Sequence, residues 1–431
     1  MKRLAWALSL GLSVLLMATG FPSSARGAGP VTLTWWSMWN PGEPQMQVLD
    51  KIAKDFQQAN PNIKVNILWG GRGILAKVRQ TLLTGNPPDL VDKDADEMGG
   101  AFISNGQALP LDDVVNAKIE GEDKTISAVV PNSYLKQFYM NGHYYLIPYE
   151  VISSGFWYNS AQAGKFGLTN PPNTWDQFVA LAKTLKGKGI PPLALDPLGI
   201  NSAYYFYWLA ERFGGPGAFN KAAGDKTGAA WNDPMWAKVS GAVADLVALK
   251  PFEPNYEGSK YPSGQNVWAQ GNAAMLLMGS WAPSETEKMA VPGFQYRMFP
   301  FPQVSGGKNS VEVYLIGWSI PKGAKQVDAA KKLMLYAMNK TRLQGIIDVA
   351  KNLTPRTDMS APPELKDVKA MLESGAPVNR IYDGVQTDYP GWWQTVFIPL
   401  DDQLILGKLT GTAFLSQLKQ NSINYYKTNS R

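Results

Sequence analysis

Cysteine is absent from the 431 residues, and histidine occurs once, at His143 in the segment NGHYYLIP. Without cysteine the chain can form neither disulfides nor thiolate metal sites. Nucleophilic catalysis through a histidine base would depend on His143 alone, and its place in a turn before an aromatic strand predicts a surface residue. Zinc sites and most nucleophilic mechanisms therefore lose their usual groups. We expect no catalytic residue and no cofactor.

Long apolar runs are also scarce, with one exception near the start of the chain. Residues 4–18, LAWALSLGLSVLLMA, follow two basic residues and precede the small-residue stretch SSARGAG. This order is typical of a secretory signal peptide, and the run is shorter than the ~20 residues that cross a membrane. We predict a signal peptide over residues 1–27, with cleavage after Ala25 or Gly27. Because no cysteine follows to accept a lipid, we expect an exported protein without an anchor, in the periplasm.

Charge of one sign is not concentrated anywhere. The sequence has 41 Lys and Arg against 35 Asp and Glu, a formal net charge of +6. Three of the basic residues belong to the predicted signal peptide, and the others are dispersed without blocks of like charge. A nucleic-acid surface needs a basic patch or stripe, so we expect no nucleic-acid partner. About 400 residues remain after cleavage, enough for more than one domain.

The sequence does contain a clear alternation of strands and helices. Val31, Leu33 and Trp35 alternate with threonines, as in a strand. From Gln45 onward the apolar positions change to a spacing of three and four, as on one helix face, and residues 63–67 alternate again. A strand, a helix and a strand within about 40 residues predict a βαβ unit with parallel strands.

Later segments repeat this alternation. NTWDQFVALAKTLKGKG predicts a helix in which Thr174 and Gln177 form a capping box and Gly187 marks the end. DAAKKLMLYAMN predicts a further amphipathic helix. Strands and helices that alternate over this length predict an α/β protein with more than one lobe. No flexible linker is visible, so we expect the chain to pass between lobes on short segments.

Many of the 15 tryptophans follow directly on predicted strands or helices, and the stretch TWWSMWN at 34–40 holds three of them. Ligands of open α/β sheets bind beyond the carboxyl ends of strands, and an aromatic ring suits the C–H face of a sugar. A single tryptophan is more often a core residue, and Trp35, which points the same way as Leu33, is predicted there. The tryptophans that we predict in a ligand cleft are Trp36, Trp39, Trp69, Trp281, Trp318 and Trp392.

Three charged residues are candidates on position alone: Arg72 in WGGRG, Asp94 in DKDAD and Glu150 after IPY. Charged side chains can bind the hydroxyl rim of a sugar, with about 1.5–3 kcal/mol per hydrogen bond. Each has a plain structural alternative. Arg72 can form a surface salt bridge, Asp94 can cap the following helix, and Glu150 can bond a backbone amide.

Several segments, taken in order, resemble one family. The series consists of GNPPDLVDKDADEMGGAFISNGQALPLDD (85–113), NGHYYLIPYEVISSGFWYN followed by PPNTWDQFVALAKTLK, WAQGNAAMLLMGSW (268–281), TPRTD (354–358) and PGWWQTVFIPL (390–400). Over nearly the whole mature chain this series is similar to the extracellular solute-binding proteins of carbohydrate ABC transporters, and most to the maltose-binding type.

The resemblance implies a two-lobed periplasmic-binding-protein fold, each lobe a mostly parallel sheet flanked by helices. It implies lobe one at 28–150 and 319–353, lobe two at 151–312 and 354–431, and a hinge segment at 313–318. Further crossings are expected near 150–154 and 353–357. The implied function is that of a monomeric receptor, which binds a sugar between the lobes, closes around it and delivers it to a membrane permease.

The resemblance also assigns individual residues. It implies ligand contacts at Asn40, Asp96, Tyr204, Trp281 and Trp392, and we add Tyr205 beside Tyr204. Three positions depart from the maltose-type pattern. Lys93 replaces an aromatic residue, Glu97 replaces an arginine, and Ser202 replaces a glutamate. These departures argue against maltose as the ligand but leave a sugar cleft intact.

Other functions remain open. A glycosidase could use Glu150 and Asp96 as paired carboxylates, which needs a separation of roughly 5 to 9.5 Å. A ferric-ion receptor could use the tyrosine pairs in AYYFY and NYYK, and a calcium ion could bind the acidic turn at 92–97. A closer alternative is another solute on the same fold, such as a polyol or a glycerophosphodiester, although a phosphate favours several Arg or Lys. We expect a receptor that leaves a sugar unchanged, and so no enzyme.

Overall fold

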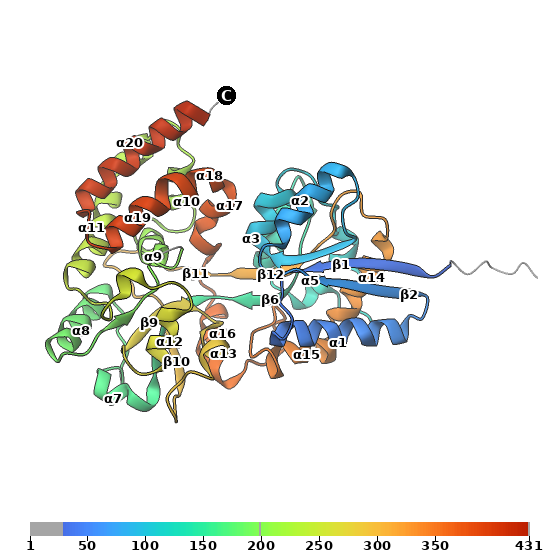
Figure 1. Ribbon diagram of the computed structural model, residues 1–431, viewed down its shortest axis with the longest axis horizontal. Coiled ribbons are helices and arrows are strands. Elements are labelled where there is room, and N and C mark those ends of the chain that lie inside the picture. Colours follow the sequence, from blue (N-terminus) through green and yellow to red (C-terminus); the bar gives the residue numbers. More distant parts are fainter. Residues whose placement is uncertain (1–28, 198–199, 430–431) are drawn as a thin grey trace, which may run out of the picture.

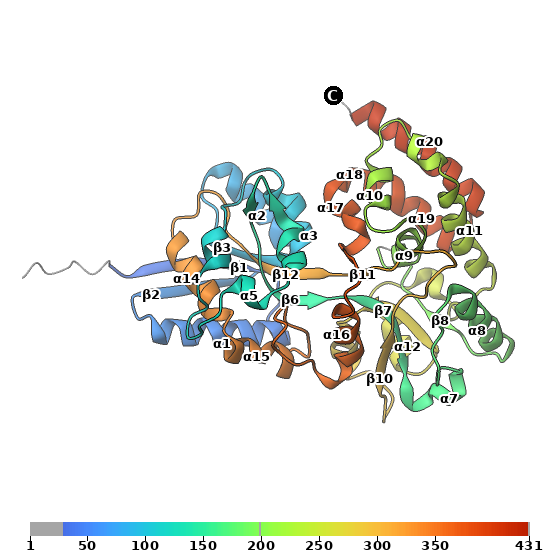
Figure 2. The same ribbon diagram turned by 180° about the vertical axis from the view of Figure 1, so that it is seen from behind.

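The computed structural model describes residues 29–197 and 200–429, and these form two lobes that lie side by side (Figure 1). Viewed from behind, the start of the described chain and the last helix lie at opposite ends of the molecule (Figure 2). The predicted signal peptide, residues 1–27, lies outside the described residues. Within the described part, the helices have neither the length nor the apolarity that a bilayer crossing requires.

Lobe one is built on a five-stranded sheet in the order β2-β1-β3-β12-β6. Its strands are β1 (Val31–Ser37), β2 (Ile63–Trp69), β3 (Leu90–Asp94), β6 (Ile147–Ile152) and β12 (Tyr314–Ser319). A hairpin of β4 (Tyr139–Met140) and β5 (His143–Tyr144) lies apart from this sheet. Its helices are α1 (Pro44–Ala59), α2 (Ile74–Thr84), α3 (Ala95–Met98), α4 (Asp112–Asn116), α5 (Ile126–Val129), α6 (Asn132–Leu135), α14 (Val327–Ala337) and α15 (Lys340–Asp348).

Lobe two is built on a four-stranded sheet in the order β10-β7-β9-β8. Its strands are β7 (Ser154–Asn159), β8 (Leu193–Ala194), β9 (Met275–Gly279) and β10 (Tyr296–Phe299), and β11 (Val311–Glu312) pairs in parallel with β13 (Val378–Asn379) beside it. The helices are α7 (Ala163–Phe166), α8 (Trp175–Gly187), α9 (Ala203–Gly214), α10 (Ala218–Ala223), α11 (Pro234–Ala248), α12 (Ser263–Ala269), α13 (Ala282–Thr286), α16 (Lys366–Leu372), α17 (Val385–Asp388), α18 (Pro390–Trp392), α19 (Ile398–Ile405) and α20 (Gly411–Asn429).

The predicted two-lobed α/β fold is confirmed, but the strand directions differ from the prediction. β1 runs parallel to β2 and β3, as the βαβ pattern predicts, whereas β12 runs antiparallel to β3 and β6. In lobe two, β7 is antiparallel to both of its neighbours, and β8 is parallel to β9. The connections between the two lobes explain these strand directions. β6 leaves lobe one toward β7 and β12 returns to it, so adjacent strands run in opposite directions, and both sheets are mixed.

Local sequence signals explain where the helices begin and end. α1 begins at Pro44, whose fixed φ suits a first helical position, and buries Leu49, Ile52 and Phe56 on one face. In α8 the predicted capping box is present, with Thr174 accepting from the Gln177 backbone N–H at 3.3 Å. The helix ends at Gly187 as predicted.

Both faces of the lobe-two sheet are covered. On β7, Phe156 and Tyr158 pack into a core made with the helices of lobe two, while Trp157 belongs to a second core that continues into lobe one. Burial of such side chains contributes about 1.5–3 kcal/mol each to folding. The two lobes therefore share one apolar junction.

The chain passes between the lobes at three places. β6 continues into β7 through the buried Ser153, and β11 leads into β12. The third passage follows the TPRTD segment, because Arg356 still pairs with Glu122 of lobe one at 2.8 Å. β12, at 314–319, lies within the sheet of lobe one. We therefore propose crossings at 152–154, at 312–314 and after Asp358, in place of the boundaries that the resemblance implied.

Candidate binding site between the lobes

A buried carboxylate organises the aromatic residues that follow β1. Asp92, near the end of β3, accepts from Trp35 Nε1 at 2.5 Å and from the Tyr149 hydroxyl at 2.9 Å. That hydroxyl in turn accepts from Trp39 Nε1 at 2.8 Å. Burial raises the pKa of Asp92 to about 6, and these hydrogen bonds offset part of the effect. These hydrogen bonds join β1, β3 and β6, and they fix the orientation of the Trp39 ring.

Arg72 covers Trp39 at the rim of lobe one. Its guanidinium carbon lies 4.7 Å from the centre of the Trp39 ring, and Nη1 donates to Glu43 at 3.0 Å. Asn40 is exposed and donates to the same carboxylate through its backbone and its side chain. Gly71 has φ +69, and a Cβ there would meet Asn40 Oδ1 at 2.6 Å. The glycine lets the WGGRG loop approach the turn after β1, so Arg72, Trp39 and Asn40 come together, and Arg72 forms the salt bridge that was noted as its structural alternative.

Glu150 and Tyr314 lie at the junction beside these loops. Both are placed by the paired hinge strands β6 and β12. Glu150 is buried, and its Oε2 has no hydrogen-bond partner among the described residues. Burial raises the pKa of Glu150 to about 8, which the positive charge of Arg72 partly offsets. The pKa of Tyr314 is raised well above its usual value by burial and by the charges of Asp94, Glu97 and Asp96.

Lobe two contributes Trp281 opposite these residues. Its ring lies 6.4 Å from that of Tyr314 in an edge-on arrangement. A Cβ at Gly279 would overlap the Trp281 ring, which explains the glycine of the Gly–Ser–Trp motif. Trp281 Nε1 is buried without a hydrogen-bond partner among the described residues.

A second polar group of lobe two gathers around Glu285. The hydroxyl of Tyr261 donates to Glu285, and Gln265 Nε2 donates to the same carboxylate at 2.8 Å. Burial, followed by the charge of Glu285, raises the pKa of Tyr261, whereas the charge of Arg72 lowers it. Arg72 of lobe one therefore lies within electrostatic reach of this group across the junction.

The acidic segment 92–97 is partly neutralised by its own lysine. Lys93, where the family resemblance led us to expect an aromatic residue, is buried and pairs with Asp94 and, at 2.9 Å, with Glu97. Asp94 also accepts from the Glu97 backbone N–H at 2.7 Å, so it caps α3, the structural alternative noted for it. Burial and the charge of Asp94 raise the pKa of Glu97 to about 7.

Asp96 in the same turn is bonded to lobe two. Arg380 reaches its Oδ1 with Nη2 at 2.6 Å, and Thr387 donates to the same oxygen at 2.8 Å. Burial raises the pKa of Asp96, and the charge of Arg380 offsets part of that rise. A cavity of about 490 Å³ lies beside Arg380, and both lobes line it. We call Trp39, Arg72, Asp96, Glu150, Trp281 and Tyr314 the interlobe site.

Three predicted site residues lie in the core instead. Trp318 is buried between Trp35 and Tyr149, with ring centres 6.2 and 4.4 Å away. Tyr205 is buried against Phe156 and Phe252. These placements differ from the cleft positions that we predicted for them.

Trp392 is the third residue, and it lies inside the helical core of lobe two. Its ring stacks on that of Trp231 at 6.0 Å, and Nε1 donates to Ser422 at 3.0 Å. We predicted an exposed stacking surface at this segment, but its aromatic residues are buried.

Trp69 and Trp36 are partly exposed, whereas Tyr204 and Trp39 are buried as well. Trp69 is half-buried with its ring 6.1 Å from Trp35, and Trp36 is half-buried on the face of β1 opposite Trp35. Tyr204 is buried 5.1 Å from the Tyr382 ring. Burial and the neighbouring Tyr382, Glu312 and Tyr314 raise its pKa well above the usual value, so its hydroxyl lies near the junction.

Sequence reasoning missed Tyr314 and Arg380. Tyr314 precedes Trp318 by four residues in YLIGW, and the hinge position of that segment was the available signal. Arg380 carried no signal, because its partner Asp96 lies 284 positions away. His143 is exposed and pairs with Asp112 at 2.9 Å, as a surface histidine should. Among residues 29–197 and 200–429, no three His, Asp or Glu side chains gather as a metal site.

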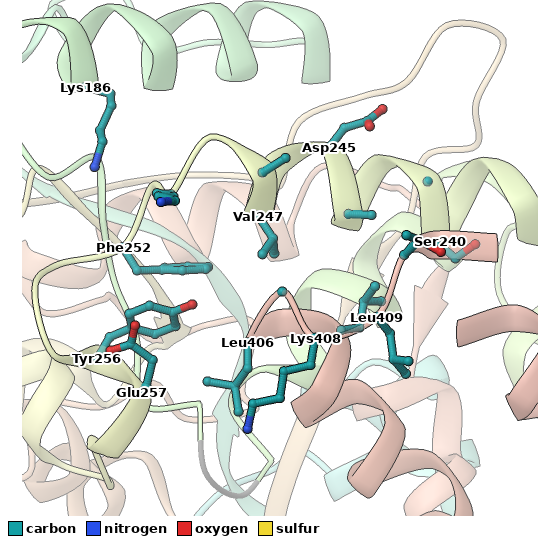
Figure 3. A pocket seen from close by; sticks show the side chains of 18 of the residues that line it. Lys186, Ser240, Asp245, Val247, Phe252, Tyr256, Glu257, Leu406, Lys408 and Leu409 are labelled. Carbon is teal, nitrogen blue, oxygen red and sulfur yellow. The ribbon is translucent and has the colours of Figure 1, made fainter. Parts of the chain in front are cut away.

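A separate cavity of about 1040 Å³ lies within lobe two (Figure 3). Phe252, Tyr256, Val247 and Leu406 line it, with Lys186 and Lys408 near its edge (Figure 3). All of its lining residues belong to lobe two: to α8 and residues 189–191 after it, to α11, to the 250–257 segment, and to the end of α19, the turn after it and the start of α20. It has no contribution from lobe one, so closure of the lobes would not change it, and it is not the interlobe site.

Comparison with known proteins identifies the family of the chain. Residues 40–341 match the family model of the bacterial extracellular solute-binding proteins. An uncharacterized ABC transporter extracellular-binding protein of Pyrococcus horikoshii is 26% identical over 353 residues, covering 80% of this chain and 76% of the relative. The multiple sugar-binding protein of Streptococcus mutans is 26% identical, with 79% of each chain covered.

Solved structures show the same fold. A chitin oligosaccharide binding protein superposes with a TM-score of 0.72 at 23% identity, covering 91% of this chain and 98% of the other. The apo-form of RafE from Streptococcus pneumoniae gives a TM-score of 0.70 at 20% identity, covering 92% and 98%. With the family model matched over most of its length, the chain belongs to the bacterial extracellular solute-binding proteins.

Proposed function

We propose that the protein is the receptor of an ABC transporter and binds a di- or oligosaccharide between its two lobes. The observation that carries this proposal is the interlobe site itself. It sets the aromatic pair Trp281 and Tyr314 beside two carboxylates, Asp96 and Glu150, that each keep one oxygen without a hydrogen-bond donor. Relatives named as sugar-binding proteins support the same reading.

The chemistry of a sugar matches these groups. A pyranose ring offers a C–H face to an aromatic plate and hydroxyl donors to carboxylate oxygens, and hydrogen bonds to charged acceptors contribute about 1.5–3 kcal/mol each. Among the described residues, Asp96 Oδ2 is an acceptor and Trp281 Nε1 a donor without a partner, and the Glu150 carboxyl, whose pKa of about 8 keeps it mostly protonated near pH 7, can donate or accept through Oε2. A ligand with many hydroxyls can satisfy all three. The residues that we propose to surround it are Trp39, Asn40, Arg72, Asp94, Asp96, Glu150, Tyr204, Tyr261, Trp281, Glu285 and Tyr314.

A phosphate-bearing solute is the weaker candidate. Three cations near the junction, among the described residues, already have carboxylate partners: Arg72 pairs with Glu43, Lys93 with Asp94, and Arg380 with Asp96. A phosphate would have to displace these partners, whereas a neutral polyol would not. A polyol therefore remains the alternative ligand on the same fold.

The rest of the proposal follows from the family. We infer that residues 1–27 direct export to the periplasm, that the receptor acts as a monomer without a cofactor, and that it leaves its ligand unchanged. Lobe closure around the ligand would present the surface that a permease recognises. Closure is a population shift, driven by contacts that the ligand makes only when both lobes touch it.

The test is a titration of the purified mature protein with maltose, trehalose, cellobiose, xylobiose, longer oligomers, glycerol phosphate and ferric citrate. Tryptophan fluorescence and melting temperature are the readouts. A ligand of the native state raises the free energy of unfolding by about 2.7 kcal/mol at a hundredfold excess over its Kd. A saturable shift with one sugar, which Trp281→Ala moves to about 3- to 10-fold higher sugar concentration, supports the proposal. A shift with glycerol phosphate or ferric citrate alone contradicts it.

A further inference from the structure

Arg380 makes an ion pair across the junction. Its Nε and Nη2 lie 2.9 and 2.6 Å from Asp96 Oδ1, and its guanidinium carbon lies 5.1 Å from the centre of the Phe138 ring. Asp96 and Phe138 belong to lobe one, whereas Arg380 directly follows β13 of lobe two. The Asp96 side chain is 3% exposed and that of Arg380 is 21% exposed. The pair is therefore largely removed from water where the lobes meet.

The backbone that carries Arg380 is shaped for this reach. Tyr382, Asp383 and Gly384 all have positive φ, so the chain turns sharply just after the arginine. Asp383 fixes the turn by accepting from the backbone N–H groups of Gly217 and Asn220, at 2.8 and 2.9 Å. A Cβ at Gly384 would lie 2.7 Å from the Arg380 guanidinium carbon. The glycine thus leaves room for the arginine to lie across its own turn.

The facing part of lobe one is equally close. Thr387 Oγ1 donates to Asp96 Oδ1 at 2.8 Å, and its methyl would lie 2.9 Å from a Cβ at Gly99. At Gly100 a Cβ would come within 3.3 Å of the Thr387 carbonyl oxygen. Two consecutive glycines therefore let the lobes approach, and the approach brings Asp96 to its two partners.

We propose that Arg380 and Thr387 form an interlobe clamp on Asp96, which is complete only in the closed receptor and which holds Asp96 for the ligand. Oδ1 is taken by the clamp, and Oδ2 is buried without a donor among the described residues. A donor for Oδ2 must come from a ligand hydroxyl or from water. Arg380 is thus a positioning residue, and its effect on ligand affinity acts through Asp96 and through closure.

Removal of Arg380 should shift the lobes toward the open state. With the lobes closed, a variant without Arg380 would bury the Asp96 carboxylate without its ionic partner. Removing one partner of a buried ion pair destabilises a protein by more than the intact pair stabilises it. Opening returns Asp96 to water and avoids this cost. The ligand must then supply the difference, so its apparent affinity falls with the population of the closed state.

The experiment compares Arg380→Gln with Arg297→Gln. Arg297 is a matched control because it pairs with Asp367 through Nε and Nη2, at 2.6 and 3.0 Å, within lobe two. Small-angle X-ray scattering of the ligand-free proteins measures closure, and calorimetry measures affinity for the sugar found in the titration above. We expect a larger radius of gyration for Arg380→Gln alone, and an affinity about 10- to 100-fold weaker, the factor for a lost charged hydrogen bond.

Two further variants keep the test decisive. Arg380→Lys should restore part of the closure, and Arg380→Gln with Asp96→Asn should be more closed than Arg380→Gln alone, because no unpaired charge is then buried. Equal radii of gyration for wild type, Arg380→Gln and the double variant overturn the clamp. The ligand effect rests on the proposed function, but the scattering does not. Failure of every sugar to bind would overturn that function and leave the clamp to be decided by scattering.

Discussion

Two groups of tryptophan residues in this protein look alike in the sequence and differ in the structure. In lobe one, Trp35 and Trp39 each donate an indole N–H into a network around Asp92 and Tyr149. In lobe two, Trp392 stacks within a core of aromatic rings. Trp39 directly precedes the turn NPG, and Trp392 directly follows Pro390 and Gly391. Trp35, Trp39 and Trp392 are all buried. Clustering at the ends of elements therefore does not separate a binding surface from a core.

The largest expected effect is on the stacked core. Trp392→Ala removes a fully buried ring, and such truncations cost about 3–5 kcal/mol. We expect a correspondingly lower midpoint in urea unfolding, followed by circular dichroism. Ligand affinity of the folded protein should stay within about threefold, because the ring does not face the junction. If Trp392→Ala instead lowers ligand affinity without lowering stability, Trp392 belongs to the ligand site.

The second effect concerns Glu150, which lies beside the lobe-one group. Its pKa is raised to about 8 in the folded protein, so the folded state holds this proton more tightly than the unfolded chain does. Stability should therefore fall as the pH rises from about 4.5 to 8, by roughly 2–4 kcal/mol. Glu150→Gln should flatten this part of the profile, measured by thermal unfolding at closely spaced pH values. Trp392→Ala should keep the wild-type slope, and an unchanged slope in Glu150→Gln would contradict the assignment.

The third effect compares the acceptors of two indole groups. Tyr149→Phe removes the acceptor of Trp39 Nε1, and Ser422→Ala removes that of Trp392 Nε1. Each leaves a buried donor unpaired, so both should lose about 1–3 kcal/mol of unfolding free energy. Only Tyr149→Phe should also weaken sugar binding, because only Trp39 belongs to the interlobe site. Equal effects of the two variants on calorimetric affinity would remove the distinction between the groups.

The parts of the fold that were predictable from the sequence are those set by short-range patterns. Alternation over residues 31–35 placed Trp35 in the core, and it is fully buried. The Thr174 capping box placed the start of α8. Both depend on neighbours within a few positions, where one sequence carries the information.

The remaining features depend on partners far along the chain. Trp392 is in a core because Trp231 and Phe397 cover it, and Trp318 because Trp35 and Tyr149 do. No local pattern reports which face of an element another segment will cover. The ion pair of Arg380 with Asp96 joins residues 284 positions apart, so no local sequence pattern could predict it either.

The fourth effect is confined to Trp281. Trp281→Ala should weaken sugar binding about 3- to 10-fold, the range of a single aromatic contact, with little change in stability because the ring is half-buried. Gly279→Ala should reproduce part of this loss, since a Cβ there would displace the ring. Calorimetry with the identified sugar measures both. If Gly279→Ala binds as wild type does, the position of the ring over the glycine is not what recognises the ligand.

The smallest effect belongs to the polar rim over Trp39. Glu43 accepts from Asn40 and Arg72, and although burial raises its pKa, these hydrogen bonds lower it overall. A lowered pKa stabilises the fold above about pH 4.5, and this contribution disappears as the pH falls through the folded value. The side chains of Arg72 and Glu43 are 46% and 28% exposed, so the pair is worth less than about 1 kcal/mol.

Glu43→Gln should therefore lower the unfolding free energy by under about 1 kcal/mol at pH 7, and by less in 1 M salt, where exposed charges are screened. The difference from wild type should shrink as the pH falls through the folded pKa of Glu43, because the carboxyl is then protonated in both states. Chemical unfolding at these conditions measures it. A loss above about 2 kcal/mol would mean that the rim holds Trp39 in place, since an exposed pair alone cannot contribute that much. The orientation of the Trp39 ring would then depend on its contact with Arg72 as well as on its hydrogen bond to Tyr149. The effects of substitutions at Arg72 and Tyr149 would then not be independent.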